Sequence, residues 1–189
     1  NAGGFTASAG SVTIATDAPA DIADRFVTVK LPRPSGPQKL IGKEVKYRFK
    51  NGGGQSTGDA GTGGDDGYVI VQLNTLSARN DFRTQLINAI NSANGNGSGA
   101  TSADDRVVSV AAGGAGVLNF TSVVQSTLSN GSDVESNLSV STSDANTSAV
   151  QFVNGTGLVT GQLSGGKVYI NINSANVASA TRTAYMAEG

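Results

Sequence analysis

The strongest constraint on the fold is one stretch, residues 68–93, in which an apolar run is followed by an amphipathic pattern. The run YVIVQL has the length and the branched apolar residues of a buried strand. After it, apolar residues recur at the three- and four-residue spacing of a helix: Phe82, Leu86, Ala89, Ile90 and Ala93. Ser77 is of a type that caps helix N-termini, and Asn94-Gly95 suits a left-handed C-terminus. The sequence therefore predicts a helix over about 77–93 with one buried face.

Most other apolar residues alternate with polar ones, as they do in half-buried strands. The predicted strands cover 11–14, 26–31, 44–50, 107–111, 117–121, 137–141, 149–153, 157–163 and 167–173. The residues between them are rich in glycine, serine, threonine and asparagine, which favour turns. We therefore expect an α+β, β-rich fold, in which one helix covers a mainly antiparallel sheet.

Length and composition predict one domain with extensions. The chain has 189 residues, of which 38% are hydrophobic, so its core is thin for its length. Residues 1–24 and 174–189 contain little apolar periodicity and are predicted to be N- and C-terminal arms that order against neighbouring subunits. The globular domain is assigned to 25–173. Within it, the glycine-rich stretch 51–67 is predicted to be a mobile surface loop.

The residue types that are missing argue against catalysis. The sequence contains no cysteine and no histidine, so it lacks thiolate nucleophiles, disulfides and the commonest general base and metal ligand. The close carboxylate pairs, Asp104 with Asp105 and Asp133 with Glu135, lie in polar stretches that would not separate their pKa values. Residues 161–168 resemble a phosphate-binding loop but have Val168 where magnesium needs a hydroxyl ligand. We expect no enzymatic activity, no cofactor and no catalytic residue.

A calcium site is the remaining metal hypothesis. Asp59, Asp65 and Asp66 lie in the glycine-rich loop and could offer oxygen ligands to calcium. No repeated calcium-binding signature supports this, and ordering a glycine-rich loop costs conformational entropy. The preferred interpretation is a solubilising loop, and the sequence leaves calcium binding by 51–67 open.

The charges are distributed unevenly. Residues 25–50 contain eight basic residues against Glu44 alone, a net charge of +7, so the rest of a chain with net charge −1 carries −8. Strand alternation places Lys46, Arg48 and Lys50 on one outer face. We expect these three residues to form an interface with an acidic surface of a neighbouring subunit. Nucleic acid is the competing partner, and it is disfavoured because no aromatic ring is expected beside the charges.

The order of the segments resembles that of a known class of proteins. A strand, a glycine-rich loop, the strand at 68–73, a helix containing LINAINSA, a short strand at 107–111 and a Ser/Thr/Asn-rich tail follow one another. This order, over about residues 26–165, resembles modules in virion structural proteins of tailed bacteriophages, found in capsid decoration, head-fibre and tail-associated proteins. The resemblance carries no functional residues across.

The resemblance implies a non-enzymatic protein on the virion surface that decorates or extends a capsid. Its expected partners are copies of itself and a capsid or other virion protein, without nucleic acid or membrane. An extracellular adhesin or filament subunit is the alternative, because predicted arms that add strands to neighbours would serve either assembly.

Overall fold

The computed structural model describes residues 5–34, 41–126, 129–131 and 133–156. Its strands are β1 (Ala7–Ile14), β2 (Phe26–Pro32), β3 (Gly42–Lys50), β4 (Tyr68–Gln72), β5 (Val108–Ala112), β6 (Val117–Gln125), β7 (Asn137–Val140) and β8 (Thr147–Val153). The α-helix within these ranges is α1 (Arg79–Ile90), and short 3-10 turns cover Pro19–Asp21, Gly63–Asp65 and Ala103–Asp105. The strands expected at 157–163 and 167–173 and the C-terminal arm at 174–189 lie outside the described residues.

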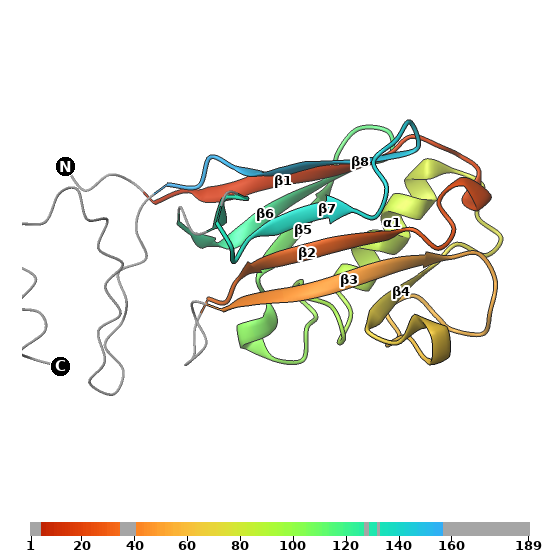
Figure 1. Cartoon of the computed structure of the whole chain (residues 1–189), viewed down its shortest axis with the longest axis horizontal. Helices are drawn as coiled ribbons and strands as arrows, with labels where there is room; N and C mark the ends of the chain where they lie inside the picture. Colours follow the sequence, from red (N-terminus) through yellow and green to blue (C-terminus); the bar gives the residue numbers. More distant parts are fainter. Residues whose placement is uncertain (1–4, 35–40, 127–128, 132, 157–189) are drawn as a thin grey trace, which may run out of the picture. The chain divides into compact units, whose positions relative to one another are not determined.

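The strands form two four-stranded sheets, in the orders β5-β6-β1-β8 and β4-β3-β2-β7 (Figure 1). Every pairing is antiparallel except that between β3 and β4, which is parallel. The α+β, β-rich, mainly antiparallel fold predicted from the sequence is therefore confirmed, with two sheets in place of the single one expected. No helix in the described part of the chain is long and apolar enough to cross a bilayer.

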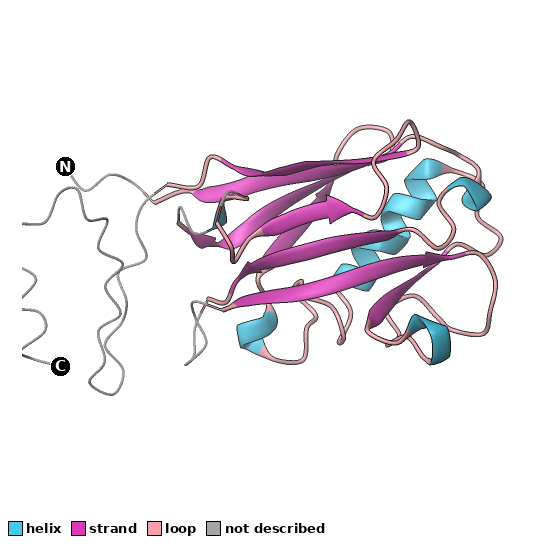
Figure 2. Ribbon diagram, viewed as in Figure 1, coloured by secondary structure: helices cyan, strands magenta, loops and turns pink. Residues whose placement is uncertain are grey.

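The two sheets meet on one side and are separated by the helix on the other. Strands β7 and β8 lie side by side, and the side chain of Gln151 in β8 bonds to β7. Its Oε1 accepts the Leu138 backbone N–H at 2.6 Å, and its Nε2 donates to Asn137 Oδ1 at 2.9 Å. On the opposite side, α1 packs against both β4 and β5 (Figure 2). Helix and sheets thus enclose one continuous core.

Helix α1 contributes the residues to this core that its spacing predicts. Phe82, Leu86 and Ile90 are fully buried, as is Ala89 between them. A second part of the core is polar: the Tyr47 hydroxyl donates to Asn96 Oδ1 at 2.6 Å. Both residues are fully buried, and burial raises the pKa of Tyr47. Hydrogen bonding makes burial of these polar groups tolerable.

Residues 1–24 do not form the predicted arm, because from residue 7 onward they belong to the domain. Strand β1 lies between β6 and β8 and pairs with both. Val12 and Ile14 of this strand are buried, and so is Ile22 in the segment that follows. The N-terminal boundary of the globular domain predicted at residue 25 is therefore wrong: the described residues before it supply an inner strand.

The small side chains of β1 have a packing reason. A Cβ added to Gly10 would lie 2.8 Å from the Leu138 side chain and 2.8 Å from the Val150 carbonyl oxygen. Ser8 is fully buried and donates a hydrogen bond to the Ser129 carbonyl. Small residues thus let β1 approach β7 and β8 closely, where the two sheets meet. The low apolar content of this segment reflects close packing within the chain rather than a lack of partners.

The start of α1 is fixed by a residue distant in sequence. Ser77 does not cap the helix: the N-cap is Ala78, which makes no side-chain capping bond. Asp17, from the loop after β1, takes this role through its Oδ1, which accepts the Arg79 backbone N–H at 2.8 Å. The Arg79 guanidinium also donates to both carboxylate oxygens of Asp17, at 3.0 and 2.6 Å. The cap and an ion pair therefore join β1 to the helix.

This contact predicts a pH dependence of stability. Hydrogen bonds from the side chain of Arg79, and then from its backbone N–H, lower the pKa of Asp17 from 3.8 to about 2. Because this pKa is depressed in the folded state, the stabilisation is complete above about pH 4 and is lost as the pH falls through about 2. We expect Asp17→Asn, which keeps a carbonyl oxygen, to lower the free energy of unfolding near neutral pH and to have little effect near pH 2. Urea denaturation across this range measures the difference.

Asp81→Asn is the control for that series, because Asp81 lies in the first turn of α1 and is exposed. It reports the general effect of a negative charge near a helix N-terminus. A stability difference between wild type and Asp17→Asn that stays constant down to about pH 2 would contradict the assigned pair.

The helix ends differently from the prediction as well. It stops at Ile90 with Asn91 as the C-cap, three residues before the predicted end. Gly95 does not adopt the left-handed conformation expected of it. A Cβ at Gly95 would lie 2.1 Å from the Ile90 carbonyl oxygen, so glycine is needed for close approach. Gly97 N–H donates to the same oxygen at 2.8 Å and satisfies one of the last carbonyls of the helix.

The glycine-rich segment 51–67 is anchored, so the prediction of a mobile loop is wrong. Its backbone pairs with the edge of β4 that β3 leaves open. Gly58 N–H donates to the Ile70 carbonyl at 2.9 Å, and Ile70 N–H donates to the Asp59 carbonyl at 3.0 Å. Gly61 N–H donates to the Tyr68 carbonyl at 2.8 Å. The loop covers an edge strand through backbone bonds, which require no apolar side chains.

Candidate functional site

The three basic residues proposed as an interface lie on the outer face of β3, as their alternation predicts. Lys46, Arg48 and Lys50 are half-buried, and the residues between them point into the core and are buried. Lys46 is the most exposed of the three, with 43% of its side chain accessible, and its ammonium lies 3.7 Å from the Glu44 carboxylate. The sequence-predicted residues are therefore brought together on one face.

Arg48 and Lys50 already have acidic partners within the chain. The Arg48 guanidinium lies 3.2 Å from Asp24 and 3.0 Å from Asp65. The Lys50 ammonium lies 2.9 Å from Asp24 and 3.4 Å from Asp65. The hydrogen bond from Lys50 lowers the pKa of Asp24; burial opposes it less strongly, and the charges of Lys50 and Arg48 reinforce it. Two cations and two carboxylates thus neutralise one another.

Aromatic rings accompany these charges, so the expectation that none would do so is wrong. The Arg48 guanidinium lies 5.3 Å from the centre of the Tyr68 ring, which itself lies 5.4 Å from the Phe26 ring. Tyr68 comes from the neighbouring strand β4, and its pairing with β3 was not evident from the sequence. Contact with the ring and with two carboxylates holds Arg48 in place. A phosphate would have to compete with those carboxylates for the same cation.

The remaining described cations of segment 25–50 are also close to carboxylates. The pairs are Arg25 with Asp144, Lys30 with Glu135, Arg33 with Asp105, and Lys43 with Asp105. At Asp105, burial opposes ionisation, but Lys43 and Arg33 together lower the pKa overall. The charge asymmetry of the sequence is therefore balanced to a large extent inside one subunit, because acidic residues distant in sequence fold back onto the basic segment.

The carboxylate pairs considered for acid–base chemistry are engaged in the same contacts. Asp105 faces two cations, and Glu135 lies 3.4 Å from Lys30 and accepts the backbone N–H of Gly42. Asp133 Oδ1 accepts the Glu135 N–H at 3.1 Å, which closes a local turn. These bonds tie Asp105, Asp133 and Glu135 to neighbouring structure.

The calcium hypothesis gains no support from the loop geometry. Asp59 Oδ2 accepts the Ser56 N–H at 2.7 Å, and Asp65 faces Arg48 and Lys50. No group of three acidic side chains suited to a metal ion occurs among the described residues. The phosphate-loop-like stretch at 161–168 lies outside them.

A different surface stands out at the end of the domain where the described chain ends emerge. The exposed apolar residues at this end include four from the chain ends and the segments beside them, which we call the apolar end: Phe5, Ile41, Val134 and Val153. Val134 is 84% exposed, the highest value among the exposed large apolar residues of the described chain. Several exposed apolar side chains at one end of a domain are candidates for burial against another molecule.

Hydrogen bonds define how this end is built. Thr6 and Thr156 exchange backbone hydrogen bonds of 3.2 Å, so the two described chain ends lie side by side (Figure 1). Residues 129–131 and 133–136 cross from these ends to the other sheet, where they contact its inner strands β2 and β3. Their contacts are Asn130 with Gly155, and Glu135 with Gly42 and Lys30. The crossing segment carries Val134, and Ile41 directly precedes Gly42.

Sequence reasoning did not single out the apolar end. Phe5 and Val134 each stand alone in a stretch of small and polar residues. This isolation is the one feature of the sequence from which the exposure of their side chains could have been predicted. Their proximity arises from contacts between segments more than a hundred residues apart, such as Thr6 with Thr156. No local pattern encodes such a contact.

Comparison with known proteins does not assign a function to this site. No protein-family model matches the chain, and no significant match was found among curated proteins or among solved structures. Its function is therefore inferred from its own residues.

Proposed function

We propose that this protein is a non-enzymatic structural protein of a virion, which decorates or extends a capsid through contacts between subunits. The order of its segments supports this, because it resembles that of bacteriophage virion proteins. The absence of histidine and cysteine, together with carboxylates held in ion pairs, supports a role without catalysis. The proposed location is the virion surface, and the proposed partners are copies of the chain and a capsid or other virion protein.

The observation that carries the proposal is the apolar end. Burying its four side chains against a neighbouring subunit contributes about 25 cal/mol for each Å² of apolar surface removed from water. The two described chain ends pair with each other at this end, through Thr6 and Thr156. Interfaces of stable assemblies have such an apolar centre with a polar rim.

The apolar end replaces the outer face of β3, with Lys46, Arg48 and Lys50, as the main proposed interface. Arg48 and Lys50 are satisfied by Asp24 and Asp65, and a new acidic partner would gain little from them. Lys46 is the more accessible cation of that face, and it can orient an approaching subunit without providing much affinity.

Substitution of the most exposed residue tests this interface. We expect Val134→Asp to abolish oligomers or binding to capsids of the encoding virus, because a charge would be buried without a partner. The free energy of unfolding should change by no more than about 0.5 kcal/mol, since Val134 is 84% exposed. Sedimentation velocity and electron microscopy report assembly, and urea denaturation reports folding.

Val150→Asp is the matched control: Val150 is 60% exposed but lies in the interior of β8, where it pairs with Ser11. It should assemble like the wild type. Equal assembly of Val134→Asp and wild type would overturn the proposed interface. Filaments formed by the purified protein, without binding to capsids, would instead favour the alternative of an extracellular adhesin or filament subunit.

A further inference from the structure

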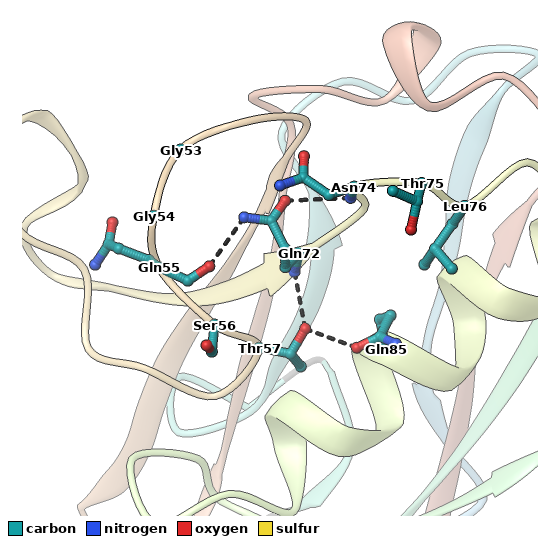
Figure 3. A pocket seen from close by; sticks show the side chains of 10 residues that line it. All are labelled: Gly53, Gly54, Gln55, Ser56, Thr57, Gln72, Asn74, Thr75, Leu76 and Gln85. Atoms are coloured by element: carbon teal, nitrogen blue, oxygen red, sulfur yellow. Dashed lines mark hydrogen bonds between the residues drawn. The ribbon is translucent and has the colours of Figure 1, made fainter.

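A hollow of about 500 Å³ lies between the glycine-rich segment, the end of β4 and helix α1 (Figure 3). Its size is in the range of sites for small molecules. The lining is made of glycine, amide and hydroxyl residues with one apolar side chain, Leu76, and it contains no charged residue. The amides come from three different segments: Gln55 from the loop, Gln72 and Asn74 from the end of β4, and Gln85 from the helix.

Gln72 fixes the shape of the hollow. Its Nε2 donates to the carbonyls of Gly52 and Gln55, at 3.2 and 2.9 Å. Its Oε1 accepts the backbone N–H groups of Leu73 and Asn74, at 3.0 and 3.3 Å. All donors and acceptors of this amide are therefore used in holding the loop to the strand end, so Gln72 positions the wall without being free to bind a ligand.

The helix side of the hollow is fixed in the same way. The Thr57 hydroxyl accepts the Gln72 backbone N–H at 3.0 Å and donates to Gln85 Oε1 at 2.7 Å (Figure 3). This bond orients the Gln85 amide and leaves its Nε2 group, a double donor, without a partner among the described residues. The side chains of Asn74, Thr75 and Ser56 likewise make no hydrogen bond within the described part of the chain.

The rim of the hollow also contains a strained residue. Thr75 has φ of +63°, which is unfavourable for a β-branched side chain. The surrounding turn holds it there, since Leu76 N–H donates to the Leu73 carbonyl at 3.0 Å. Strained backbone that persists in a fixed turn clusters at functional sites such as ligand clamps. The side chains of Asn74 and Thr75 point in different directions from this rim, the Asn74 amide toward the Gln72 side and the Thr75 hydroxyl toward the Gln85 side (Figure 3).

We propose that this hollow is a binding site for a neutral saccharide. Amides and hydroxyls offer donors and acceptors side by side, and each sugar hydroxyl can both donate and accept. A phosphate or other anion would find no cation in the lining, and a peptide would find one apolar anchor, Leu76. The lining contains no aromatic ring for stacking, so binding depends on a few hydrogen bonds to uncharged groups. We therefore expect a dissociation constant on the order of millimolar.

The test is a titration of the isotopically labelled full-length protein with maltotriose and with chitotriose, followed by NMR. We expect at least one of these neutral trisaccharides to shift the signals of residues 53–57, 72–76 and the Gln85 side chain. Asn74→Ala removes a side chain that makes no bond within the described chain and should weaken binding about three- to tenfold, the effect of one neutral hydrogen bond. Gln85→Leu should weaken it by at least as much.

Two controls keep the result interpretable. Asn88→Ala changes an exposed amide on the same helix outside the hollow and should leave binding unchanged. Inositol hexakisphosphate, an anion, should not shift the signals of the hollow. The proposal is overturned if neither trisaccharide shifts them at about 50 mM, or if Asn74→Ala and Gln85→Leu both bind as the wild type does. These outcomes are independent of whether the protein assembles through the apolar end.

Discussion

Deletion of residues 1–24 is expected to unfold the whole domain. The deletion removes β1, so β6 and β8 lose the strand that lies between them and their backbone groups lose their partners. It also removes three buried side chains, Val12, Ile14 and Ile22, each of which contributes about 1.5–3 kcal/mol when buried. Their sum, roughly 5–9 kcal/mol, is comparable with the entire stability of a typical domain. Circular dichroism and urea denaturation of the truncated protein measure the effect.

Deletion of residues 1–4 is the control, because it leaves β1 intact. This shorter protein should unfold cooperatively with a midpoint close to that of the full chain. If the protein lacking residues 1–24 also unfolded cooperatively, β1 would be dispensable, and the segment would act as the arm that its composition suggests.

Leu86→Ala should reduce the free energy of unfolding by about 2–5 kcal/mol, as is usual when a large buried side chain is truncated. Leu86 is fully buried on the face of α1 that packs between β4 and β5. The helix separates the two sheets there, so a cavity at this position weakens contacts with both. Urea denaturation measures the change, and the slope against urea concentration should stay constant if the native surface is preserved.

The matched control on the same helix is Asn88→Ala, because Asn88 is exposed. It should change the free energy of unfolding by no more than about 0.5 kcal/mol. A loss below about 1 kcal/mol for Leu86→Ala would mean that the site collapses without a cavity or that the helix is not packed as described.

Much of the local structure could be predicted from the sequence. The alternation in 44–50 correctly assigned Val45, Tyr47 and Phe49 to the core and the three basic residues to the outer face. The spacing of Phe82, Leu86 and Ile90 correctly predicted a helix with that buried face. The strands predicted at 107–111 and 117–121 are present as β5 and β6, which pair with each other.

The candidate site was predictable only in part. The outward direction of Lys46, Arg48 and Lys50 follows from alternation, but their partners come from other segments. Asp24 precedes β2, and Asp65 lies in the loop after β3. The apolar end and the polar hollow were not predicted, because each is assembled from segments that have no shared sequence pattern.

The sequence by itself determined the periodic features of this protein, because backbone geometry repeats every two residues in a strand and every 3.6 residues in a helix. The tertiary structure decided the features that depend on distant partners. Asp17 caps a helix that begins 62 residues later, a role that the sequence predicted for Ser77. Likewise, the small residues around Gly10 form an inner strand because β7 and β8 lie too close for larger side chains. Both features depend on which segments the topology brings together. The spacing of residues within one segment does not determine which distant segment will contact it.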